Sequence, residues 1–189
     1  ILNIMNTLKD KIVLITGGAS GMGKIMTRLM LERDATVIIW DIDDVKMQET
    51  VTEFSSIGSI YGYKVDISEI DQIKNTAEKV QQEIGVVDVL INNAGIIVGK
   101  YFHEHSTVEI SKTMEINTNA AMHITAQFLP DMMNQNSGNI CNIASSGGLV
   151  SNPKMSVYAA SKWAMIGWSD SLRLEMKQLQ KNINVTTIM

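Results

Sequence analysis

The sequence predicts an α/β fold, a doubly wound parallel sheet that forms a single domain over residues 1–189. Short runs rich in β-branched residues alternate with longer amphipathic segments, a pattern typical of repeated βα units. With 189 residues, 45% of them apolar, the chain can bury a sizeable core. No linker, repeat or shift in composition indicates a second domain.

The expected elements alternate along the chain. Strands are expected at residues 12–16, 36–41, 59–65, 87–92, 139–144 and 184–189. Helices are expected at residues 22–33, 45–56, 69–84, 108–133 and 156–179. Right-handed crossovers would bring the carboxyl ends of the strands to one edge, where a ligand is expected to bind. Because the chain ends within the sixth strand, we expect a last strand and a substrate-covering loop to be missing.

The composition argues against several classes of function. The 16 basic and 20 acidic residues give a net charge of -4, and no cluster of Lys and Arg favours a nucleic-acid partner. No apolar run approaches the roughly 20 residues that span a bilayer, so no membrane span is expected. Cys141 is the single cysteine, which excludes an internal disulfide and fits a cytoplasmic location. His103 and His105 have no carboxylate or thiol at ligand spacing, so no metal site is expected.

A glycine cluster, TGGASGMG at residues 16–23, lies between the first strand and the first helix. Gly17 would permit a tight turn, Gly21 would let the main chain approach a pyrophosphate, and Gly23 would let the helix pack against the sheet. The N-terminus of the helix would add free N–H groups and a positive dipole end. The GxxxGxG spacing therefore predicts a dinucleotide site, to which we also assign Ser20 and Met22.

Asp41 closes the second strand about 20 residues after the glycines, where its carboxylate could accept hydrogen bonds from the adenosine ribose hydroxyls. The same carboxylate would repel a 2′-phosphate, and its neighbours Gly18, Ile42 and Asp43 carry no positive charge. We therefore expect NAD(H) as the cofactor, with NADP(H) the less favoured candidate. The alternative is a solvated carboxylate at a strand end.

Two further strand ends complete the expected cofactor site. Asp66 and Ile67 follow the third strand and would lie beside the adenine, although Asp66 could equally cap the next helix. Asn93, Ala94 and Gly95 follow the fourth strand, where small and amide residues would leave room for a cofactor that crosses the sheet edge.

Tyr158 and Lys162 are four residues apart on an expected helix and therefore share one face. Free tyrosine titrates near ~10, and a nearby ammonium stabilises the phenolate, so the pair suits general acid/base chemistry. Both residues are also expected to contact the cofactor. Ser145 ends the fifth strand and could hold a substrate oxygen against the phenol, with Ser146 as the alternative. Asn117, an unusual choice inside a helix, could hold a water that links Lys162 to solvent.

These motifs resemble those of the short-chain dehydrogenase/reductase family, in its compact branch with GxxxGxG and YxxxK motifs. They stand in the family's order through essentially all of the chain, at 16–23, Asp66, 92–95, Asn117, Ser145, Tyr158 and Lys162. The resemblance implies a Rossmann fold and hydride transfer between NAD(H) and a secondary alcohol or ketone. It also implies that Tyr158 is the general acid/base. The stretches 37–43 and 128–133 resemble those of 17β-hydroxysteroid and retinol-type members, which act on lipid alcohols, and they also resemble those of bacterial oxidoreductases of unknown substrate.

Other functions remain open. An NADPH-dependent 3-oxoacyl reductase is one, and Asp41 argues against it. A protein that binds NAD(H) without turnover is another, and the complete set of catalytic residues argues against its having lost activity by descent. Apolar residues in the loops 96–104 and 147–156 fit an apolar alcohol or ketone, or apolar packing, equally well. The helices at 108–133 and 156–179 are apolar beyond one stripe, which predicts a homodimer or homotetramer unless a missing segment covers them.

Overall fold

Six parallel strands form one sheet in the computed structural model, which describes residues 8–150 and 152–189. The strand order is β3-β2-β1-β4-β5-β6, and every neighbouring pair runs parallel. The strands are β1 (Ile12–Thr16), β2 (Thr36–Asp41), β3 (Ile60–Lys64), β4 (Val89–Asn92), β5 (Gly138–Ile143) and β6 (Ile183–Ile188). The order reverses between β1 and β4, which confirms the doubly wound Rossmann arrangement.

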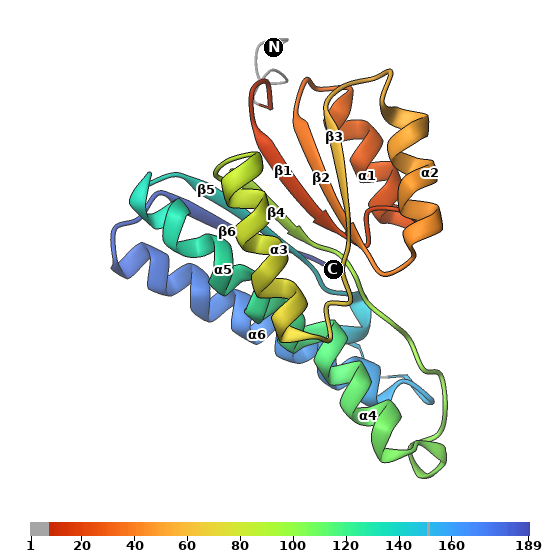
Figure 1. Ribbon diagram of the computed structural model, residues 1–189. Helices are drawn as coiled ribbons and strands as arrows, with labels where there is room; N and C mark the ends of the chain where they lie inside the picture. Colours follow the sequence, from red (N-terminus) through yellow and green to blue (C-terminus); the bar gives the residue numbers. More distant parts are fainter. Residues whose placement is uncertain (1–7, 151) are drawn as a thin grey trace, which may run out of the picture.

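Helices cover both faces of the sheet (Figure 1). On one face lie α1 (Gly21–Leu31) and α2 (Asp44–Phe54), and on the other lie α3 (Ile70–Glu83), α5 (Ala120–Asn134) and α6 (Ser156–Gln178). Helix α4 (Thr107–Met114) extends away from the sheet. The short turns are η2 (Phe102–Glu104), η3 (Glu115–Asn119) and η4 (Ser146–Gly148). Every expected strand and helix is present, and their outer ends differ from the expected ones by no more than two residues.

One expected helix is interrupted. Residues 108–133 form α4 and α5, joined by the π-helical turn η3, in which the N–H of Ala120 donates to the carbonyl of Glu115. A π-turn accommodates one extra residue and breaks the regular hydrogen-bond pattern, and such turns occur often at functional sites. Asn117 lies in this turn, and its side chain binds main-chain atoms of Ile96. The expectation of one continuous helix was wrong because helical periodicity does not register a single inserted residue.

Two apolar layers hold the helices on the sheet. On the side of α3, α5 and α6, Trp40 packs against Phe128 with ring centroids 5.8 Å apart. On the side of α1 and α2, Ile15 and Ile39 of the sheet share one buried cluster with Leu31 of α1 and Met47 of α2. The central strand β1 is buried on both faces, as expected for a parallel sheet. Because the sheet is packed on both faces, the positions of its strand ends are fixed. The candidate site is formed by the loops that follow these strand ends.

Candidate active site

The glycine loop between β1 and α1 has the geometry that its sequence predicts. Gly17 and Gly21 adopt φ values of +64° and +49°, a region that other residues enter at a cost. A Cβ atom on Gly23 would overlap the main-chain oxygen of Gly17, so only glycine allows α1 to start this close to the loop. The tight loop therefore depends on glycine at all three positions.

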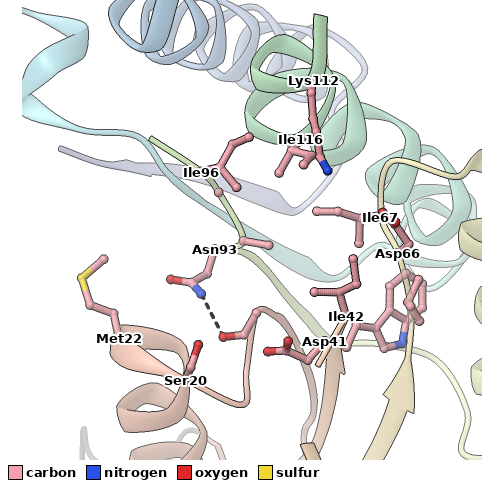
Figure 2. A pocket seen from close by; sticks show the side chains of 15 residues that line it. Ser20, Met22, Asp41, Ile42, Asp66, Ile67, Asn93, Ile96, Lys112 and Ile116 are labelled. Carbon is pink, nitrogen blue, oxygen red and sulfur yellow. Dashed lines mark hydrogen bonds between the residues drawn. The ribbon is translucent and has the colours of Figure 1, made fainter. Parts of the chain in front are cut away.

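Side-chain hydrogen bonds connect the ends of β1 and β4 beside this loop. The hydroxyl of Thr16 accepts hydrogen bonds from the N–H groups of Asn93 and Ala94, both at 3.0 Å. The amide of Asn93 donates to the carbonyl of Thr16 at 2.9 Å. The same amide also donates to the carbonyl of Gly17 at 3.4 Å (Figure 2), so the segment 93–95 is held next to the glycine loop.

Asp41 is buried at the end of β2, with 9% of its surface exposed. One carboxylate oxygen accepts from the N–H of Ala19 at 3.1 Å, and the other accepts from the N–H of Asp43 at 3.1 Å. Asp41 thus holds the glycine loop, a role that the sequence did not reveal. Each oxygen keeps a further lone pair for a ligand. One positive charge lies nearby in α2, that of Lys46, but it is engaged by Asp43 at 2.8 Å.

A cavity of about 510 Å³ opens between these loops (Figure 2). Nine of the residues expected to contact a cofactor line it: Gly17, Ser20, Met22, Asp41, Asp66, Ile67, Asn93, Ala94 and Gly95. Gly21 instead lines a groove between α1 and α2, and Gly23 packs beneath the loop. The carboxyl ends of β1 to β4 thus build one concave surface, as the topology predicts.

Six lining residues were not expected: Trp40, Ile42, Val65, Ile96, Lys112 and Ile116. The first four are chain neighbours of expected residues, and the strand ends could have indicated them. Lys112 and Ile116 come from α4 and the π-turn. Figure 2 shows them across the cavity from Asp41, next to Ile67. Their spacing of four residues is their only signal in the sequence, and it is common to any amphipathic helix.

Asp66 both lines the cavity and shapes the turn before α3. Its carboxylate accepts from the N–H of Ser68 at 3.0 Å and from the hydroxyl of Ser68 at 2.6 Å. The cap residue of α3 is Glu69 rather than Asp66. Asp66 is therefore not the helix cap that the sequence also allowed, but its carboxylate shapes the turn before α3 and can still face a ligand.

Tyr158 and Lys162 lie on one face of α6, as expected. Lys162 is buried, and its ammonium donates to the carbonyl of Ile143 at 2.8 Å. Burial lowers the pKa of Lys162 from 10.5 to about 8, because the charged form is poorly solvated there. The ammonium lies 5.8 Å from the ring centroid of Tyr158. The two side chains are therefore close neighbours on α6.

Ser145 lies next to the ring of Tyr158. A Cβ atom on Gly147 would meet Cε1 of Tyr158 at 3.3 Å and Oγ of Ser145 at 3.4 Å, so both groups flank the same glycine. The hydroxyl of Ser145 accepts from the N–H of Gly147 at 3.1 Å, which leaves its own hydrogen for another acceptor. Ser146 is exposed in η4. The geometry therefore favours Ser145 over Ser146 as the partner of Tyr158.

Asn117 and Gly95 connect this cluster to the cavity. The side chain of Asn117 accepts from the N–H of Ile96 at 2.7 Å and donates to the carbonyl of Ile96 at 2.9 Å. A Cβ atom on Gly95 would lie 3.2 Å from Oδ1 of Asn117 and 3.7 Å from Nζ of Lys162. Gly95 lines the cavity on its other side. The residues expected to bind the cofactor and those expected to act in catalysis thus come together at Gly95.

Within residues 8–150 and 152–189, no helix combines the length and hydropathy needed to cross a bilayer. No group of three or more His, Cys, Asp and Glu side chains there could hold a metal ion. Cys141 has a free thiol, and burial raises its pKa.

Comparisons with known proteins agree with this geometry. The family model for short chain dehydrogenases matches residues 11–189. An uncharacterised oxidoreductase of Bacillus subtilis (strain 168), YvrD, is 37% identical over 95% of this chain and 66% of its own length. Estradiol 17-beta-dehydrogenase 11 of Homo sapiens is 34% identical over 92% of this chain and 58% of its own length. The chain therefore spans less than two thirds of the length of these relatives.

A solved structure has the same fold. A short chain dehydrogenase/reductase from Burkholderia phymatum, crystallised in complex with NAD, superposes with a TM-score of 0.92 at 27% identity, over 95% of this chain and 65% of that one. The sheet order, the glycine loop and the family match lead to one conclusion: the chain belongs to the short-chain dehydrogenase/reductase family of oxidoreductases.

Proposed function

We propose that the protein transfers a hydride between NAD(H) and a secondary alcohol or ketone. The observation that carries the proposal is the meeting of the cavity with Asn117 and the ammonium of Lys162 at Gly95. The names of similar proteins, an estradiol dehydrogenase and a family member in complex with NAD, support the same class. Fluorescence titration with NADH tests binding, and a panel of sterols, retinoids and short alcohols with NAD⁺ tests turnover. Absence of NADH binding would refute the proposal.

The lining of the cavity offers a place for each part of a dinucleotide. Gly17, Ser20 and Met22 would face the pyrophosphate at the start of α1, with Gly21 and Gly23 shaping the loop. Asp41 would bind the ribose, Asp66 and Ile67 would flank the adenine, and the segment 93–95 would lie beneath the nicotinamide half, near Tyr158 and Lys162. When bound, the nicotinamide ring would accept or supply the hydride.

Tyr158 would move the proton of the substrate oxygen. In oxidation its phenolate accepts the hydroxyl proton while the hydride leaves the carbinol carbon, and in reduction its phenol donates the proton back. The ammonium of Lys162 would stabilise the phenolate by its charge. The free hydrogen of Ser145 would donate to the substrate oxygen and hold it beside the phenol.

Asn117 would act through its main chain. Both atoms of its amide are engaged by Ile96, and the amide nitrogen also donates to the hydroxyl of Ser161 at 3.1 Å. A relay water would therefore bind a main-chain carbonyl of the π-turn, where regular helical bonds are incomplete. Such a water would connect Lys162 to solvent and return the proton that Tyr158 gives or takes.

Exchanging the charge at the end of β2 should move the cofactor preference toward NADP(H). Asp41→Ser keeps an oxygen for the N–H groups that the carboxylate now binds, and Ile42→Arg has room because Ile42 is 58% exposed. We expect the affinity ratio of NADPH to NADH to rise by about 10-fold or more, since a charged hydrogen bond contributes about 1.5–3 kcal/mol. Fluorescence titration of both cofactors measures the ratio, with Val45→Arg on α2 as control. If the unmodified protein binds NADPH as tightly as NADH, the role of Asp41 is wrong and a 3-oxoacyl reductase becomes the better candidate.

The substrate would enter between two loops beside Tyr158. These loops precede α4 and α6, and the ammonium of Lys154 lies 5.0 Å from the ring centroid of Tyr101, which joins them. Ile97, Leu149 and Val150 are all at least half exposed there. Exposed apolar side chains around the entrance support an apolar alcohol or ketone as substrate.

Assembly into a homodimer or homotetramer is a further expectation. The residues that could form its interface differ from those that the apolar pattern of the helices suggests. The helices expected at the interface place several apolar residues, among them Phe128 of α5 and Leu172 and Met176 of α6, in the chain's own core. Trp163 of α6 is instead 51% exposed. We expect light scattering at micromolar concentration to give at least twice 20.9 kDa, and Trp163→Glu to lower that mass. Val45→Glu, at an exposed apolar residue of α2, should not. A monomer in the unmodified protein would refute this expectation.

A further inference from the structure

Ser161, between Tyr158 and Lys162 on α6, joins the catalytic cluster to the π-turn. The residue is fully buried. Its hydroxyl donates to the carbonyl of Tyr158 at 2.7 Å and accepts from the amide of Asn117 at 3.1 Å. Its own carbonyl accepts from the hydroxyl of Thr118 at 2.9 Å. Ser161 therefore connects the turn of α6 that carries the acid/base pair to two consecutive residues of the π-turn.

The π-turn depends on such contacts for its position. Regular helical hydrogen bonds are incomplete there, so side-chain bonds to neighbouring elements fix where its atoms lie. Asn117 is bound to Ile96 on one side and to Ser161 on the other. Gly95, next to Ile96, approaches both Asn117 and the ammonium of Lys162. A shift of the turn would therefore change the surroundings of that ammonium directly.

We propose that Ser161 is a positioning residue for proton transfer, which with Thr118 holds the π-turn against α6 so that Asn117 and Lys162 keep their relative placement. The inference rests on the proposed function. Ser161 does not touch the cavity or the face of Tyr158 beside Ser145, so its effect reaches the reacting atoms only through these neighbours.

Ser169 on the same helix offers a matched control. It is 1% exposed, and its hydroxyl accepts from the amide of Asn142 at 2.8 Å and donates to the carbonyl of Met165 at 2.7 Å. Replacing either serine by alanine removes the same two kinds of hydrogen bond from the same helix. Similar losses of thermal stability are expected from both. Only Ser161 contacts the π-turn.

The test compares Ser161→Ala, Ser161→Thr and Ser169→Ala. Phenolate absorbance is recorded against pH with and without NAD⁺, and the signal of Tyr158 is isolated by subtracting Tyr158→Phe in each background. We expect Ser161→Ala to raise the pH midpoint of that signal by about one pH unit and to lower turnover at neutral pH by about 10-fold. NADH affinity should stay within about 2-fold. Ser161→Thr keeps the hydroxyl and should restore the midpoint, and Ser169→Ala should leave it unchanged.

An unchanged midpoint in Ser161→Ala, or an equal shift in Ser169→Ala, would overturn the inference. Thr118→Val removes the second bond at a buried residue of nearly the same shape, so it answers the question if Ser161→Ala does not fold. An unchanged midpoint there would also count against the inference. Failure of the unmodified protein to bind NADH would refute the proposed function instead, and the titration without NAD⁺ would still decide the role of Ser161.

Discussion

Phenylalanine in place of Tyr158 should lower turnover by about 100-fold or more and leave NADH affinity nearly unchanged. The substitution keeps the ring, which lies against Gly147 and beside Ser145, and removes only the transferable proton. Within the described part of the chain the hydroxyl of Tyr158 makes no hydrogen bond, so its loss leaves no buried partner unsatisfied. The melting temperature should therefore stay close to that of the unmodified protein.

Turnover of the best alcohol in the panel, followed by NADH absorbance, measures this effect. Tyr61→Phe is the control, since Tyr61 is an exposed tyrosine on the edge strand β3. It should keep most of the activity. Substantial turnover by Tyr158→Phe would mean that another group moves the proton, and the assignment of Tyr158 would have to be abandoned.

The fold was predictable because each strand carries its own local signal. β1 and β2 are runs of β-branched residues, and their ends fall where the sequence places them, at Thr16 and Asp41. Because strands and amphipathic helices alternate, the sheet is expected to be parallel. Connections between parallel strands are nearly always right-handed, so only a few strand orders are possible. Most of the cavity follows from the topology too, because residues that directly follow a strand end must lie at the sheet edge.

The rest of the site depends on contacts between distant segments. Lys112 reaches the cavity only because α4 extends past the ends of β3 and β4, and nothing near it in the sequence indicates this. Ser161 was passed over because a serine inside a helix usually faces solvent or its own main chain. The π-turn was missed for a related reason: its extra residue becomes visible only when Asn117 is seen bound to Ile96.

Methionine in place of Lys162 should abolish most of the activity and make the protein more stable at neutral pH. Lys162 is 4% exposed, and burial lowers its pKa to about 8 from 10.5. The folded protein thus loses the proton more easily than the unfolded chain. The buried charge therefore destabilises the folded state fully below about pH 8, and this penalty disappears as the pH rises toward 10.5.

The expected gain of Lys162→Met at pH 7 is about 1–2 kcal/mol. A shift of this size corresponds to at most about 3 kcal/mol, and the carbonyl of Ile143, left without its donor, offsets about 1 kcal/mol. Denaturant unfolding at pH 7 and at pH 9.5 measures it, with Lys74→Met at an exposed position of α3 as control. The gain should shrink at the higher pH for Lys162→Met and stay near zero for Lys74→Met.

Turnover of Lys162→Met should fall by about 100-fold, because the phenolate of Tyr158 loses its neighbouring charge. A variant that is inactive yet no more stable at pH 7 would show that the ammonium is better solvated than its burial implies, while an active variant would remove Lys162 from the mechanism.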